Sequence, residues 1–227
     1  MKFKYLVPNF FTACSLVSGI FALKYAFQAD YNISGWLIAV SIVCDGLDGK
    51  LARVLDAASN FGRYFDTISD FFAFGIVPAV LAYVTVLHNY KIVGVIITMI
   101  YTVCGALRLT RFMRKSTNAK EKNPFTGLPI PAAAGIVSSF LIFNYTLWQG
   151  LRSPLLFALI MLFSAFLMIS KIKYVSFDIK ILNHNFMLII LFIIGLALSI
   201  FYPHYIYFLS FLIYILHGLI INFHPVE

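Results

Sequence analysis

The sequence predicts an all-α integral membrane protein with about eight transmembrane helices. Two observations support this fold class. Hydrophobic residues make up 61% of the 227 residues and charged residues only 11%, whereas soluble domains carry about 25% charged residues. The apolar residues also come in long runs, as is typical of membrane spans. The composition therefore leaves no room for a sizeable soluble domain, and one membrane domain is the simplest architecture.

Eight stretches are long and apolar enough to be expected helices. In chain order they cover residues 6–27, 33–55, 64–88, 92–113, 129–149, 154–171, 184–202 and 205–222. Pro8 suits the first turn of the first helix, where a missing N–H costs no hydrogen bond. Only Tyr202, Pro203 and His204 separate the last two stretches, which predicts a tight hairpin.

The basic residues predict the orientation in the cell membrane. With the N-terminus in the cytoplasm, fourteen of the 17 Lys and Arg residues fall in cytoplasmic stretches, and only Lys24, Lys91 and Arg152 fall outside. Cytoplasmic loops are enriched in Lys and Arg, so both termini are expected to be cytoplasmic. The same bias explains the net charge of +8 without a nucleic acid as partner. The basic segment Arg114–Gly127 is expected to attract anionic membrane lipids.

An acidic cluster marks the expected site. Five of the nine acidic residues lie between Asp45 and Asp70. Asp45 and Asp48 are three residues apart, and Asp66 and Asp70 are four apart, so each pair shares one face of a helix. The first pair ends the second helix on its cytoplasmic side and the second pair begins the third helix there. Antiparallel packing of these helices would bring all four carboxylates together.

Ionised carboxylates inside a membrane are energetically costly unless a cation neutralises their charge. One ionised Asp at mid-membrane costs about 2.5–3.5 kcal/mol, and four would also repel one another. Oxygen ligands suit hard cations such as Mg²⁺ or Mn²⁺, and paired cations are typical of phosphoryl transfer. Small residues beside the acids let a nucleotide approach the backbone; they are Gly46, Gly49, Ala52 and Gly62.

Two other interpretations of the acidic cluster stay open from the residues alone. The first is a structural plug, in which Arg53 and Arg63 pair with two of the acids. The second is a divalent-cation transporter or channel, because intramembrane carboxylates also mark ion pathways. The transport interpretation gives no reason for Arg53 amid the acids.

The spacing of these residues resembles the CDP-alcohol phosphotransferase family, whose signature is D-x2-D-G-x2-A-R-x8-G-x3-D-x3-D. Every spacing is matched, at Asp45, Asp48, Gly49, Ala52, Arg53, Gly62, Asp66 and Asp70. The resemblance implies a six-helix membrane domain, here residues 1–171, with residues 172–227 forming two additional helices. It also implies a homodimer.

The same resemblance implies roles for the site residues. Asp45, Asp48 and Asp66 would bind two divalent cations, and Asp70 would complete the metal site and act as the general base. The residues implied to line the CDP pocket are Gly49, Ala52, Arg53 and Gly62. From the residues themselves, Asn9 and Thr12 share one face of the first helix and are placed to hydrogen-bond the diphosphate.

Four further stretches resemble bacterial and archaeal members of this family that use serine. They are V-P-N-F-F-T (Val7–Thr12), R-L-T-R-F (Arg108–Phe112), F-T-G-L-P-I-P (Phe125–Pro131) and L-M-I-S-K-I-K-Y (Leu167–Tyr174). Thr110 and Met113 replace the Ala and Asn of many relatives, and neither change touches a charged group. Arg108 and Arg111 lie three apart, where they suit a lipid phosphate or the serine carboxylate.

The activity implied by this second resemblance is a direct, metal-dependent displacement. The phosphatidyl group of CDP-diacylglycerol would pass to the hydroxyl of L-serine, giving phosphatidylserine and CMP. The alternative acceptors glycerol 3-phosphate, inositol phosphate and choline stay open, because these stretches are less specific than the acidic signature.

Overall fold

The computed structural model describes residues 3–57, 59–117, 126–172, 174 and 201–223. These residues form helices and contain no β-strand, which confirms the all-α class. The long helices are α1 (Leu6–Phe27), α2 (Tyr31–Val54), α3 (Asn60–Asp70), α4 (Val77–Thr85), α5 (Ile92–Thr117), α6 (Ile130–Trp148), α7 (Pro154–Ile169) and α9 (Pro203–Phe223). Shorter elements are the 3-10 turns Phe3–Tyr5 and Leu87–Tyr90 and the π-helical turn η2 (Phe71–Ile76).

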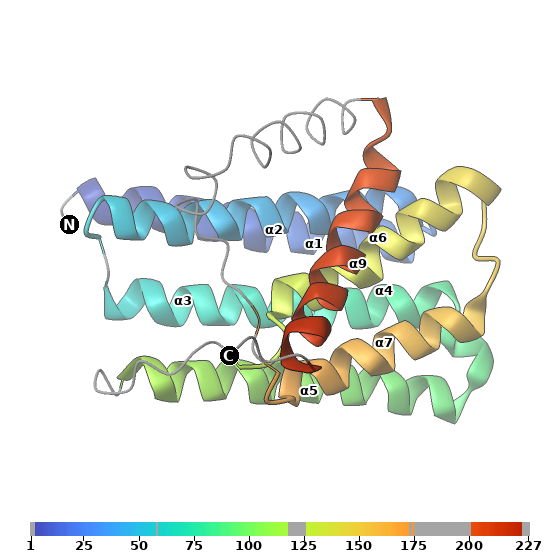
Figure 1. The fold of residues 1–227 in the computed structure, drawn as a ribbon. Coiled ribbons are helices and arrows are strands. Elements are labelled where there is room, and N and C mark those ends of the chain that lie inside the picture. The colour runs from blue at the N-terminus through green and yellow to red at the C-terminus, as the bar shows by residue number, and fades with distance from the viewer. Residues whose placement is uncertain (1–2, 58, 118–125, 173, 175–200, 224–227) are drawn as a thin grey trace.

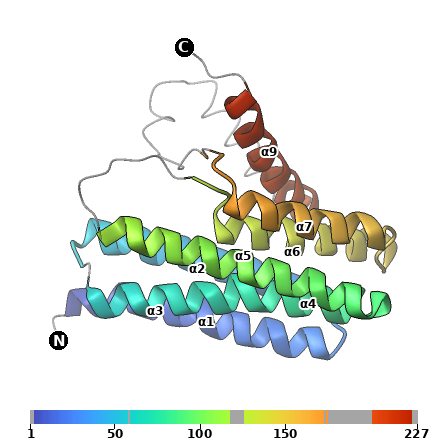
Figure 2. The same cartoon turned by 90° about the horizontal axis from the view of Figure 1, so that it is seen from below.

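Helices α1 to α7 run back and forth in one bundle, and α9 crosses this bundle over α6 (Figures 1 and 2). Among the described residues, five helices are long and apolar enough to cross a membrane. One of them is the continuous stretch Asn60–Thr85, formed by α3, η2 and α4. The expected helix 184–202 lies outside the described residues, so the total of eight stays a prediction.

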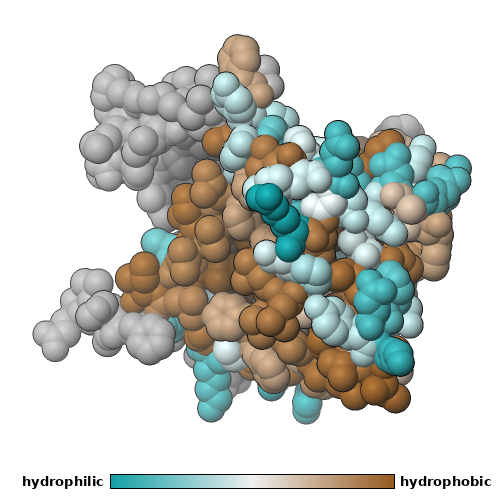
Figure 3. Space-filling view, turned by 90° about the vertical axis from the view of Figure 1, so that its right-hand side faces the viewer, coloured by the Kyte–Doolittle hydropathy of each residue, from teal (hydrophilic) through white to brown (hydrophobic). Residues whose placement is uncertain are grey.

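The outer surface of the bundle is apolar, as expected for a protein that lies in a bilayer. Large hydrophobic side chains such as Phe10, Val43, Met99 and Phe166 are more than half exposed, and contiguous apolar patches of this kind mark membrane contact. Figure 3 shows the end of the bundle with the α1–α2, α4–α5 and α6–α7 connections, where hydrophilic side chains gather beside apolar ones. The chain is therefore an integral membrane protein.

Small hydroxyl side chains join α1 to α2. The Ser15 and Ser41 hydroxyls lie 2.7 Å apart, and Ser18 donates to the carbonyl of Leu37 at 2.7 Å. Ser34 donates to the carbonyl of Ala22 at 2.8 Å. Small residues let membrane helices approach closely, and hydroxyls in an apolar interface bond across it. This packing fixes the N-terminal turns of α1 beside the last turns of α2.

A π-helical turn follows directly after the second acidic pair. Pro78, in the first turn of α4, has no N–H to offer to the carbonyl of Phe74, and in a regular α-helix its ring would clash with that carbonyl. The helix widens over Phe71–Ile76, and the buried Tyr101 hydroxyl donates to the Phe74 oxygen at 3.1 Å. One extra residue in a turn rotates the two parts of a helix by about 100° relative to each other. The direction in which α3 presents its acidic residues is therefore rotated relative to the face of α4 that packs in the core.

Candidate active site

The four aspartates of the signature meet between α2 and α3. One carboxylate oxygen from each of Asp45, Asp48 and Asp66 lies within 4.8 Å of the other two. Asp70 lies against Asp45, close enough for their carboxyl groups to share a hydrogen bond. The antiparallel arrangement of the two helices therefore produces the convergence expected from the spacing.

The oxygen cluster suits a hard divalent cation. All of its donors are carboxylate oxygens, the ligand type that Mg²⁺ and Mn²⁺ prefer. Mg²⁺ holds its ligands at about 2.0–2.1 Å, so two opposite ligands lie about 4.2 Å apart. The spacing of up to 4.8 Å among the three residues needs only small side-chain adjustments to match this geometry.

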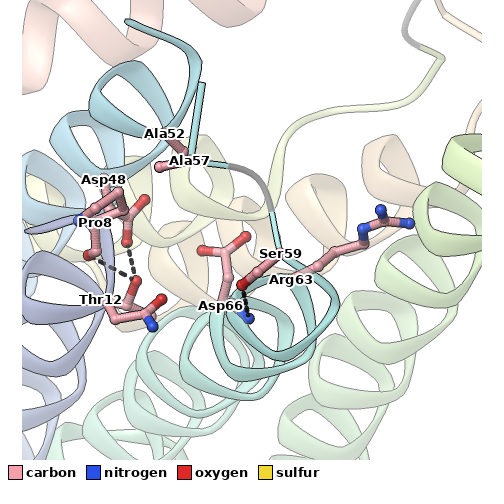
Figure 4. A pocket seen from close by; sticks show the side chains of 11 residues that line it. Pro8, Thr12, Asp48, Ala52, Ala57, Ser59, Arg63 and Asp66 are labelled. Carbon is pink, nitrogen blue, oxygen red and sulfur yellow. Dashed lines mark hydrogen bonds between the residues drawn. The ribbon is translucent and has the colours of Figure 1, made fainter. Parts of the chain in front are cut away.

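Thr12 holds one of these carboxylates in place. Its hydroxyl lies 2.7 Å from Oδ2 of Asp48 and donates to it, and both side chains are buried (Figure 4). Ser69 on α3 donates to the carbonyl of Thr12 at 3.2 Å, which links the third helix to the same residue. Thr12 therefore orients the Asp48 carboxylate within the cluster, and its expected contact with the diphosphate stays a prediction.

A cavity of about 180 Å³ opens beside the carboxylates. It is lined by Pro8, Asn9, Thr12, Asp48, Gly49, Ala52, Ala57, Ser59, Gly62, Arg63 and Asp66. Of the residues expected to bind CDP, only Arg53 is missing from this lining, because its Nε donates to the carbonyl of Gly49 at 3.0 Å on the exposed side of α2. Arg63 lines the cavity instead, and its guanidinium points away from Asp48 and Asp66 (Figure 4).

The N-terminus of α3 forms one wall of this cavity. Ser59 caps the helix by accepting a hydrogen bond from the N–H of Gly62 at 2.9 Å. Helix N-termini favour phosphate groups through their free N–H groups and the helix dipole. A Cβ at Gly62 would lie 3.0 Å from both Asn9 Oδ1 and Ser59 Oγ, whereas a Cβ at Gly49 would meet nothing within 4 Å. Sequence reasoning overlooked Ser59, although a Ser before a helical stretch is a recognisable N-cap signal.

The two arginines of α5 have different surroundings. Arg108 lies near Asp70, Asp45 and Tyr214. Arg111 donates from Nη1 to the carbonyl of Ile169 at 2.7 Å, and so pairs one of the orphan carbonyls at the end of α7. The structure thus brings Arg108, and not Arg111, to the carboxylates.

Three of the four stretches beyond the acidic signature meet at the end of α7. The N–H of Gly127 donates to the carbonyl of Ile172 at 2.8 Å, and that of Leu128 donates to Leu167 at 2.9 Å. Gly127 has φ +86°, and a Cβ there would collide with the carbonyl of Met168, so only glycine fits. These bonds join the described part of F-T-G-L-P-I-P to L-M-I-S-K-I-K-Y, beside the α5 stretch that includes Arg111.

A helical membrane bundle that places clustered aspartates beside a glycine-lined cavity has the features of a membrane-embedded transferase for phosphate-linked groups. The sequence profile of the CDP-alcohol phosphatidyltransferase family matches residues 5–201. The chain belongs to this family.

Several relatives have names that specify an acceptor. The chain is 37% identical over 196 residues to a CDP-diacylglycerol–serine O-phosphatidyltransferase of Helicobacter pylori (strain ATCC 700392 / 26695), covering 86% of this chain and 81% of that one. A protein of the same name from Bacillus subtilis (strain 168) is 30% identical over 171 residues, or 75% of this chain and 90% of that one. An archaetidylserine synthase of Methanothermobacter thermautotrophicus is 32% identical over 174 residues, covering 76% and 70% of the two chains.

Proposed function

We propose that this enzyme transfers the phosphatidyl group of CDP-diacylglycerol to the hydroxyl of L-serine, giving phosphatidylserine and CMP. The observation that carries the proposal is the cluster of Asp45, Asp48 and Asp66, of which Asp48 and Asp66 line a cavity together with Gly49 and Gly62. The names of the relatives support serine as the acceptor. They favour neither another acceptor alcohol nor cation transport.

The carboxylates and the cavity would bind different parts of the donor lipid. Asp45, Asp48, Asp66 and Asp70 would hold two divalent cations, Mg²⁺ or Mn²⁺, which would neutralise diphosphate oxygens when bound. Asn9, Gly49, Ala52 and Gly62 line the space for the nucleotide. Arg53, which donates to the carbonyl of Gly49 on the exposed side of α2, lies outside this lining. The N-terminus of α3 points its N–H groups at the same space.

The acceptor reacts on the Asp70 side of the cluster. Asp70 takes the proton of the serine hydroxyl as the oxygen attacks the phosphorus that carries the lipid. A new P–O bond forms to serine, the bond between this phosphorus and the bridging oxygen breaks, and CMP leaves with that oxygen. Arg108 lies beside Asp70, where it faces the serine carboxylate.

The site opens to the cytoplasm in this proposal. Lys50, Arg53 and Arg63 lie at the end of the bundle that carries the carboxylates, whereas Lys24, Lys91 and Arg152 lie at the other end. This bias supports cytoplasmic termini. We also propose a homodimer in which residues 1–171 form the family core and residues 172–227 add two helices.

The test is an assay of purified protein with CDP-diacylglycerol and labelled L-serine. We expect labelled phosphatidylserine and CMP in equal amounts, and loss of both products with a chelator or with Asp66→Asn. Wild-type turnover by Asp70→Asn would contradict its role as the base. CMP release that prefers glycerol 3-phosphate to serine would overturn the choice of acceptor.

A further inference from the structure

Helix α9 packs against the core of the bundle at a position that specific contacts define. Its Tyr207 hydroxyl lies 3.0 Å from that of Ser138 on α6, and the Tyr207 ring stacks on Trp36 of α2 with centroids 5.7 Å apart. The Phe211 ring fills the space that a Cβ would take at Gly135 of α6. A hydrogen bond, a ring stack and a glycine contact together fix both the rotation and the height of α9 on the bundle.

This packing brings the side chain of Tyr214, on α9, close to the residues of the proposed catalytic cluster. Tyr214 lies one turn beyond Phe211, three residues along the same face, and it interacts electrostatically with Arg108. Arg108 in turn interacts with Asp70 and Asp45. Tyr214, a residue of the C-terminal addition, and the carboxylates of Asp70 and Asp45 therefore all lie near Arg108.

Tyr174 packs against Tyr214, and its buried hydroxyl has no hydrogen-bond partner within the described part of the chain. Its ring lies 5.5 Å from that of Tyr214 and rests on Gly218 of α9, where a Cβ would overlap the ring. The side chain is only 4% exposed. A buried hydroxyl without a partner is costly and calls for an explanation. A ligand that enters beside Tyr214 would supply the missing partner.

We propose that Tyr214 and Tyr174 complete, together with Arg108, a subsite for the α-carboxylate of the acceptor amino acid. The proposal rests on the proposed function, whose acceptor it makes more specific. In this subsite the guanidinium supplies the charge and the two phenol groups each donate one hydrogen bond to the carboxylate. The acceptor hydroxyl then reaches toward Asp70, which Arg108 adjoins.

The charge of this subsite matches a carboxylate better than a phosphate. Arg108 is the one cation that the described residues place beside Tyr214 and Asp70, because Arg111 bonds the carbonyl of Ile169 instead. A phosphate monoester carries nearly two negative charges at neutral pH and would need a second cation. One guanidinium with two neutral donors suits the single charge of a carboxylate.

The experiment removes one hydroxyl at a time. Tyr214→Phe and Tyr174→Phe keep the rings that pack on each other and on Gly218, so the fold is expected to persist. We expect each variant to raise the KM for L-serine about tenfold, because a hydrogen bond to a charged group is lost. The kcat at saturating serine and the KM for CDP-diacylglycerol should change less than twofold. Ethanolamine lacks the carboxylate. The ratio of kcat/KM for L-serine to kcat/KM for ethanolamine should therefore fall by the same factor.

Two further variants complete the comparison. Tyr205→Phe makes the same change on the same helix, where the ring contacts Phe143 on α6, and should leave every constant unchanged. Gly218→Ala displaces the Tyr174 ring and should raise the KM for serine with kcat retained.

The possible outcomes separate the subsite from the function. An unchanged KM for serine in both Tyr→Phe variants, with serine-dependent CMP release in the wild type, overturns the subsite and leaves the proposed function standing. Equal losses for all substrates together with a lower Tm show a structural role and also overturn it. A wild-type protein that releases no CMP in response to serine refutes the proposed function itself.

Discussion

At the scale of single residues, Thr12 connects α1 to α2 and to α3 beside the clustered carboxylates. It donates to Asp48 at 2.7 Å, and its own backbone carbonyl accepts from Ser69. Groups that orient metal ligands commonly contribute 10–100-fold to affinity or activity, at an order of magnitude. The sequence placed Thr12 on the face of α1 that lines the cavity, and its contact with the diphosphate stays a prediction. The bond to Asp48 was not predictable, because the approach of α1 to α2 depends on packing between distant residues.

Thr12→Val should therefore lower activity by about 10–100-fold. The change removes the hydroxyl but keeps the branched shape, so Asp48 loses the bond that directs it. Titration of Mg²⁺ or Mn²⁺ in the CMP-release assay should show a higher metal requirement. Thr12→Ser, which keeps the hydroxyl, is the matched control, and an unchanged metal requirement in Thr12→Val would disprove the orienting role.

Two neighbouring glycines of α2 offer a second test at this scale. A Cβ at either Gly46 or Gly49 would meet nothing within 4 Å, so neither Ala substitution disturbs the packing of this chain. Only Gly49 lines the cavity. Gly49→Ala is expected to raise the KM for CDP-diacylglycerol severalfold, whereas Gly46→Ala should not. Equal behaviour of the two variants in steady-state kinetics would remove Gly49 from the nucleotide pocket.

At the scale of elements, the π-helical turn Phe71–Ile76 separates the part of the span that carries the acids from the part that packs in the core. The stretch 64–88 was expected to be one regular helix. The structure instead begins it at Asn60, after the Ser59 cap, and widens it ahead of Pro78. Periodicity predicts the existence of a helix well, but a change of phase within it depends on Tyr101, a partner 27 residues further along the chain.

Tyr101→Phe should destabilise the protein by about 1–3 kcal/mol, because the buried carbonyl of Phe74 loses its donor. Thermal unfolding in detergent measures this loss. The same variant should also lower kcat, since a relaxed turn alters the direction of Asp66 and Asp70. Tyr83→Phe, on the preceding helix α4, is the matched control. A Tyr101→Phe variant with wild-type stability and kcat would show that the turn holds its shape without this bond.

At the scale of the whole molecule, we expect the thermal stability of the folded protein to depend on a cation bound at the carboxylate cluster. Asp45, Asp48 and Asp66 face one another across two helices, and their mutual repulsion opposes packing unless a cation neutralises it. The D-x2-D and D-x3-D spacings made this cluster predictable, because they depend only on helix geometry. The approach of Tyr214 to Arg108 was not predictable, since α9 is joined to the core by contacts that leave no periodic signal.

Addition of Mg²⁺ or Mn²⁺ to chelator-treated protein should raise its Tm, because a cation that binds only the folded state stabilises it. Thermal melts with and without the metal measure this shift. Asp48→Asn should reduce the shift, whereas Asp30→Asn, at the N-cap of α2, should not. A Tm that does not respond to either metal would argue against a cation site between α2 and α3.

The hydroxyl bonds between α1 and α2 have a consequence for how the protein is made. These are the first two long helices of the chain, and N-terminal parts fold first during synthesis. Ser15, Ser18 and Ser41 join them without help from any later helix. We therefore expect Thr12 and Asp48 to be in position before α3 is synthesised, so that α3 would dock onto a site that is already half formed. Loss of these hydroxyls would lower the yield of inserted protein, not the turnover of each finished molecule.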